Sequence, residues 1–80
     1  MSPRLPVVRP REVVRALERA GWLQTRQRGS HLSVTKEGSR SIVSVPMYNR
    51  DIKRGTLSGI LEDAGLSIDE FIELLRGKSR

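Results

Sequence analysis

The chain has 80 residues, a net charge of +6, no cysteine and one histidine. This length predicts one domain. Without cysteine neither a disulfide nor a thiolate zinc site can stabilise it, so its apolar residues must form the core alone. No apolar stretch approaches the roughly 20 residues of a membrane-spanning helix, and residues 1–10 lack the apolar centre of a signal peptide, so we expect a cytoplasmic protein without a membrane partner.

The first predicted element is a helix that begins at Pro10, after an N-terminal extension of residues 1–9. Proline suits the first helical position because its missing N–H would be unpaired there anyway. Gly21 is the residue type that commonly follows the end of a helix. The apolar residues between them recur at helical spacing and form one face, made of Val13, Val14, Leu17 and Ala20.

Two short strands are predicted next, at residues 22–28 and 31–35, separated by Gly29-Ser30. In the second strand apolar and polar side chains alternate strictly, as in a strand with one buried face. His31 falls on the polar face, so we expect it to be exposed. If the two strands pair across the turn, Arg26 shares that face. The apolar face carries Leu32 and Val34.

The third predicted strand runs from Arg40 to Val45. Residues 36–39 are expected to form the hairpin loop before it, with Gly38 at positive φ. Pro46 is expected to end the strand because proline cannot donate a backbone hydrogen bond to a neighbouring strand.

Two helices are predicted after the polar loop of residues 47–55. Thr56 is a plausible N-cap for the first, and Gly65 ends it. Residues 67–70 (Ser-Ile-Asp-Glu) form a capping-box pattern that opens the second, in a C-terminal helical extension of residues 67–80. This acidic, amphipathic extension is suited either to packing on the core or to contacting a partner. Strands followed by helices predict an α+β fold with helices on one face of an antiparallel sheet.

The charge is distributed unevenly along the chain. Residues 1–55 contain 12 lysines and arginines against 4 acidic residues, whereas residues 56–80 contain 3 against 5. This pattern favours a polyanionic partner for the first two-thirds of the chain. A basic surface that only maintains solubility is the alternative.

The residue types present exclude several kinds of site. With no cysteine and one histidine, the usual zinc patterns are absent, and the acidic residues are too scattered to predict a magnesium site. The chain also has no Walker-type glycine loop. An enzyme with this sequence is therefore expected to use neither a metal nor a cofactor.

His31 is the candidate catalytic residue. Histidine is the side chain whose ordinary pKa, about 6.5, suits proton transfer at neutral pH. Next to arginines, an imidazole can take the 2′-OH proton of RNA as a general base, while guanidinium groups stabilise charge on the phosphate. A surface histidine without a role is the alternative, and the residue pattern alone does not exclude it.

Four segments carry a resemblance to a known family. They are Gly21-Trp22, Arg26-Gln-Arg-Gly-Ser-His31, Val45-Pro46 and the stretch from Gly55-Thr-Leu to Ala64-Gly-Leu66. In this order they resemble HicA-type mRNA interferase toxins of type II toxin–antitoxin systems. The resemblance covers residues 10–66.

The resemblance implies a fold similar to double-stranded-RNA-binding domains, with a helix, three strands and a helix. It implies ribosome-independent cleavage of mRNA, with His31 as the catalytic residue. It also implies a HicB-type antitoxin partner that covers the active site in a hetero-oligomer. Many family members have a further histidine just after Val45-Pro46, where this chain has Met47-Tyr-Asn49, so Tyr48 or a water is left as the candidate general acid.

The RNA-binding candidates lie in two segments, one before and one after the third predicted strand in the sequence. Gly29 would let the substrate approach closely, and Lys53 and Arg54 precede the predicted helix start, which itself attracts phosphate. Trp22 is predicted to be a core residue instead of a base-stacking platform. A non-catalytic RNA-binding module and a protein-interaction domain with an acidic partner are the alternative functions. The full set of RNA-binding candidates is Arg26, Arg28, Gly29, Ser30, Lys53 and Arg54.

Overall fold

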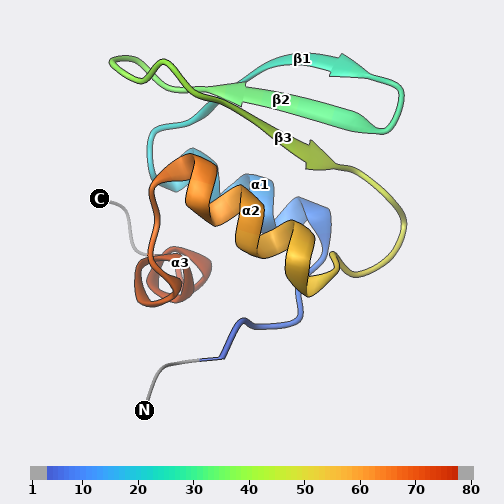
Figure 1. Cartoon of the computed structure of the whole chain (residues 1–80), viewed down its shortest axis with the longest axis vertical. Coiled ribbons are helices and arrows are strands. Elements are labelled where there is room, and N and C mark those ends of the chain that lie inside the picture. Colours follow the sequence, from blue (N-terminus) through green and yellow to red (C-terminus); the bar gives the residue numbers. More distant parts are fainter. Residues whose placement is uncertain (1–3, 78–80) are drawn as a thin grey trace.

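The computed structural model, which describes residues 4–77, confirms the predicted α+β fold class. The strands form one antiparallel sheet in the order β1-β2-β3, and the helices lie on one side of it, with α3 farthest from the sheet (Figure 1). In chain order the elements are α1 (Pro10–Arg19), β1 (Leu23–Arg28), β2 (His31–Thr35), β3 (Ile42–Pro46), α2 (Arg54–Ala64) and α3 (Ile68–Leu75).

Helix α1 begins at Pro10, as predicted, and its apolar face is buried. Val13 and Leu17 have no exposed surface. The helix start is stabilised by the Glu12 carboxylate, which accepts a hydrogen bond from the backbone N of Arg9 at 2.9 Å. Trp22, shortly after the helix, is 2% exposed and belongs to the core, as predicted.

Strands β1 and β2 form a hairpin around a two-residue turn. Gly29 has a φ of 54°, a left-handed conformation that favours glycine and is typical of such turns. The pairing register shifts between Gln24 and Arg26, and Thr25 at this bulge donates through Oγ1 to the carbonyl of Ser33 at 3.2 Å. β1 is an edge strand of the sheet because it pairs only with β2, and all of its side chains are exposed.

The third strand differs from the prediction at both ends. It begins at Ile42 and not at Arg40, because β2 ends at Thr35 and offers no further residue for pairing. It includes Pro46, which pairs with His31. The hydrogen bond at this end of the strand comes from the next residue, because the backbone N of Met47 donates to the carbonyl of Ser30. Pro46 therefore sits at a non-hydrogen-bonded pair, where its missing N–H costs no strand hydrogen bond.

Helix α2 begins at Arg54, so the prediction of Thr56 as its N-cap was wrong. The backbone N of Leu57 donates to the carbonyl of Lys53 at 2.9 Å, which makes Lys53 the N-cap residue and puts Thr56 inside the first turn. Just before it, Ile52 is 9% exposed and donates through its backbone N to the carbonyl of Val8. This buried anchor sets where the helix begins, and it outweighs the capping preference of threonine.

Helix α3 is capped as predicted and packs into the core. The backbone N of Glu70 donates to Ser67 Oγ at 3.1 Å, and the backbone N of Ser67 donates to the Glu70 carboxylate at 2.9 Å. Phe71 and Leu74 are 0% and 1% exposed. Arg19 of α1 donates through Nη1 to the carbonyl of Leu74 at 2.6 Å, which ties the two helices together. Within residues 4–77 no helix is long and apolar enough to cross a membrane.

Candidate functional site

His31 is the first residue of β2 and is exposed on the outer face of the sheet, away from the helices, as predicted. The alternation of the strand puts Leu32 and Val34 on the inner face, where both are buried. Gly29 and Ser30 form the turn directly before His31. The imidazole is therefore open to a ligand from the outer face and from the turn.

The pairing register brings both candidate arginines of β1 to the face of His31. Arg28 pairs with His31, and Arg26 pairs with Ser33, one row farther along the same face. The predicted sharing of this face by Arg26 and His31 is thus confirmed, but Arg28 is the direct cross-strand neighbour of the histidine.

Two side chains of the β3–α2 loop complete the surroundings of His31. The ring of Tyr48 lies edge-to-face against the imidazole, with ring centroids 5.9 Å apart and an angle of 83° between the planes. The guanidinium of Arg50 lies over the Tyr48 ring, 4.9 Å from its centroid. Sequence reasoning named Tyr48 only by its place after Val45-Pro46 and missed Arg50, because no spacing rule relates a loop residue to a strand 17 or more positions earlier.

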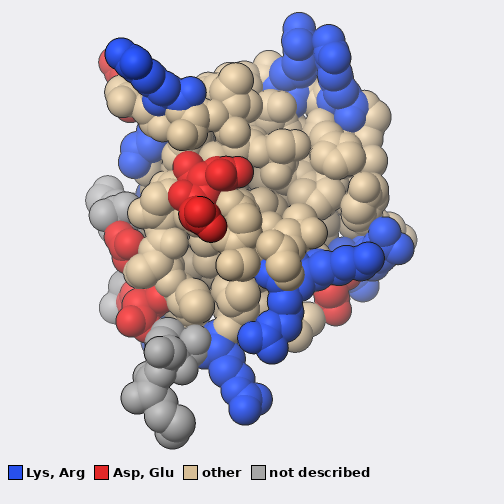
Figure 2. Space-filling view, in the orientation of Figure 1, with Lys and Arg blue, Asp and Glu red and all other residues tan. Residues whose placement is uncertain are grey.

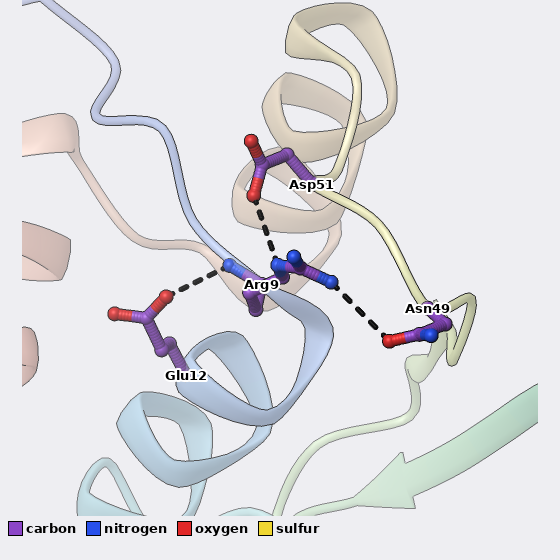
Figure 3. A network of polar contacts seen from close by, with 4 residues as sticks. All are labelled: Arg9, Glu12, Asn49 and Asp51. Carbon is purple, nitrogen blue, oxygen red and sulfur yellow. Dashed lines mark hydrogen bonds and ion pairs between the residues drawn. The ribbon is translucent and has the colours of Figure 1, made fainter.

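The β3–α2 loop is held at both ends by contacts with distant segments. At its start Met47 bonds to Ser30, and at its end Ile52 bonds to Val8. Between them, Arg9 reaches two loop residues (Figure 3). Its Nη1 donates to Asn49 Oδ1 at 3.4 Å, and its Nε lies 3.3 Å from the Asp51 carboxylate. These contacts hold the loop in the position that puts Tyr48 against His31.

Two cavities open beside Tyr48, and this residue lines both. The larger has a volume of about 480 Å³ and the smaller about 250 Å³. Lys53 lines the smaller cavity, at the start of α2, whereas Arg54 lies outside both. Lys53 is therefore near His31 by way of Tyr48, which lines the same cavity and contacts the imidazole. The larger is lined by Arg9, Pro10, Arg11, Met47, Tyr48 and Asn49.

Basic side chains lie near this site and elsewhere on the same side of the molecule. Figure 2 shows them projecting at both ends of the sheet and near the β3–α2 loop, where Asp51 pairs with Arg9, whereas a group of acidic side chains lies over the C-terminal half of α2. Across residues 4–77, no group of three or more His, Asp or Glu side chains is placed to hold a metal ion. The site thus offers an imidazole, a phenol and several guanidinium groups, which suit a phosphodiester ligand.

The family model described as "HicA toxin of bacterial toxin-antitoxin" matches residues 10–66. The matched region begins with α1 and ends just after α2, so it contains His31 and Tyr48 but neither Arg9 nor α3. No curated protein matches the chain.

Proposed function

Because the chain belongs to the HicA family of toxins from bacterial toxin–antitoxin systems, we propose that it is a metal-independent endoribonuclease that cleaves mRNA, with His31 as general base. The observation that supports this most directly is the exposed imidazole between Arg28 on the neighbouring strand and Tyr48 on the loop. RNA cleavage by the purified chain, beside its His31→Ala variant, tests the proposal.

The proposed reaction needs only groups present at this site. The His31 imidazole takes the proton of the 2′-OH, and the 2′-oxygen attacks the adjacent phosphorus. The bond from phosphorus to the 5′-oxygen then breaks, which leaves a 2′,3′-cyclic phosphate and a 5′-hydroxyl. The guanidinium groups of Arg28 and Arg26 stabilise the negative charge that grows on the phosphate oxygens. Independence of metal rests on the residue types of the chain, and cleavage in EDTA tests it.

Tyr48 is the candidate general acid that protonates the leaving 5′-oxygen. We expect Tyr48→Phe, which keeps the ring beside His31, to lower the cleavage rate by about 10²-fold, because it removes only the hydroxyl. Single-turnover cleavage of one labelled RNA measures this. An unchanged rate for Tyr48→Phe with a reduced rate for Tyr48→Ala would show that the ring positions the imidazole and that water supplies the proton.

Lys53 and Arg54 are proposed to bind the RNA backbone at the start of α2. Each is exposed, and the helix start itself attracts phosphate. We expect Lys53→Ala to weaken RNA binding about equally for all sequences and to reduce the slope of log affinity against log salt by about 1. Fluorescence anisotropy at several salt concentrations measures both. Arg40→Ala, which removes a charge from the distant β2–β3 loop, is the control and should change the affinity less.

A HicB-type antitoxin is the proposed protein partner, in a hetero-oligomer that covers the site. The outer face of the sheet supports this proposal, because it is not covered by any described element. Two large apolar side chains lie there, Leu23 at 66% and Ile42 at 65% exposed, both paired with Thr35 in one row of the sheet. Exposed apolar residues next to a basic surface are typical of protein interfaces.

A further inference from the structure

The larger cavity beside Tyr48 has the composition of a nucleobase pocket. Its lining combines Pro10, Met47 and the aromatic residue Tyr48 with the polar residues Arg9, Arg11 and Asn49. Unstacked RNA bases are bound in this way, with their flat faces on apolar or guanidinium surfaces and their edges on polar groups. Its volume of about 480 Å³ falls within the range of roughly 300–1,000 Å³ typical of small-molecule sites, whereas the smaller cavity does not reach it.

The cavity is also close to the proposed chemistry. Tyr48 lines it, and the same ring lies against the imidazole of His31. Tyr48 therefore borders both the cavity and the catalytic group. A nucleotide whose phosphate lies at His31 would have a neighbouring base within reach of this cavity.

The polar contacts of Asn49 determine what it can offer to a base. Arg9 Nη1 donates to Asn49 Oδ1, so this contact uses the amide oxygen and leaves the two N–H donors of Asn49 out of it. The ion pair of Arg9 with Asp51 holds the guanidinium in place for this contact. The two arginines that line the cavity are donors only. The side chains of the cavity thus present mainly hydrogen-bond donors.

We infer that this cavity is a specificity pocket in which Asn49, oriented by Arg9, selects the base next to the cleaved bond and favours guanine or uracil. Both bases carry a carbonyl acceptor where adenine and cytosine carry an amino donor. A donor that faces this position therefore pairs with the carbonyl of a keto base, whereas it meets a second donor in an amino base, which can accept only through its other acceptors. The inference rests on the proposed nuclease function and adds the substrate preference to it.

Asn49→Asp is the decisive variant, because it keeps the size of the side chain and exchanges its donor for an acceptor. Cleavage of a random-sequence RNA library, read by sequencing, should show the parent chain preferring guanine or uracil about tenfold at one position beside the cleaved bond. Asn49→Asp should lose this preference or move it toward adenine or cytosine. Gln24→Glu, the same chemical change on exposed β1 outside this cavity, should keep the parent profile.

Binding provides a second readout that does not depend on cleavage. In the His31→Ala background, oligo(U) should bind more tightly than oligo(C), and Asn49→Asp should remove the difference. Equal binding of the two oligomers, or an unchanged preference in Asn49→Asp, overturns the pocket assignment. If the parent cleaves no RNA but the binding preference is present and depends on Asn49, the nuclease proposal fails and the base pocket stands as part of an RNA-binding module.

Discussion

Replacing His31 with alanine is expected to abolish RNA cleavage while leaving the chain folded. General acid–base groups typically contribute about 10²–10⁴-fold to a rate, and this chain has no second histidine to take over the proton. The side chain is exposed on the outer face of the sheet, so its removal opens no cavity in the core. The measurement is cleavage of a 5′-labelled RNA by both proteins, with and without EDTA, together with their thermal unfolding.

The matched control for this experiment is Ser44→Ala. Ser44 is an exposed polar residue of β3, on the same outer face of the sheet as His31. It should retain both the activity and the stability of the parent. Cleavage by the parent alone, unaffected by EDTA, would support a metal-free histidine nuclease. A folded His31→Ala protein that cleaves at the parent rate would exclude His31 as general base. Cleavage by neither protein, with RNA still bound, would favour the non-catalytic RNA-binding module.

Replacing Phe71 with alanine is expected to destabilise the whole domain, although α3 lies outside the region that the family model matches. The side chain is fully buried, and truncating a buried phenylalanine costs about 3–5 kcal/mol. That is a large part of the roughly 5–15 kcal/mol that stabilises a typical domain. We expect the Tm to fall by at least about 12 °C, as measured by circular dichroism.

Two control variants distinguish core packing of α3 from a surface role. Phe71→Leu, which keeps most of the apolar volume, should cost less than Phe71→Ala. Glu62→Ala, on the exposed surface of α2, should change the free energy of unfolding by no more than about 0.5 kcal/mol. A Phe71→Ala protein that unfolds within a few degrees of the parent would contradict the packing seen here and would leave α3 available for a partner.

The elements that depend on local signals were predictable from the sequence. Pro10 marks the start of α1, and the Ser67–Glu70 capping box marks the start of α3, because both act through backbone groups a few residues away. The strict alternation of β2 likewise predicted that His31 is exposed and that its two neighbouring apolar residues are buried. A two-residue turn then sufficed to bring the arginines of β1 to the face of His31.

The ends of β3 and the start of α2 were decided by tertiary contacts. β3 begins where β2 stops offering partners, and α2 begins where Ile52 is anchored to Val8. Neither contact is local in sequence, so the local preferences of Pro46 and Thr56 predicted the wrong boundaries. Such preferences amount to about 1 kcal/mol, and the burial of one large apolar side chain outweighs them.

The sequence by itself determined the fold class, the exposed histidine and the basic character of the first two-thirds of the chain. Only the tertiary structure decided which loop side chains meet that histidine. Arg9 and Asn49 are 40 positions apart, and Tyr48 comes to His31 through a loop held by Ser30, Val8 and Arg9. Contacts of this kind depend on the path of the chain in space, which periodicity and capping do not encode.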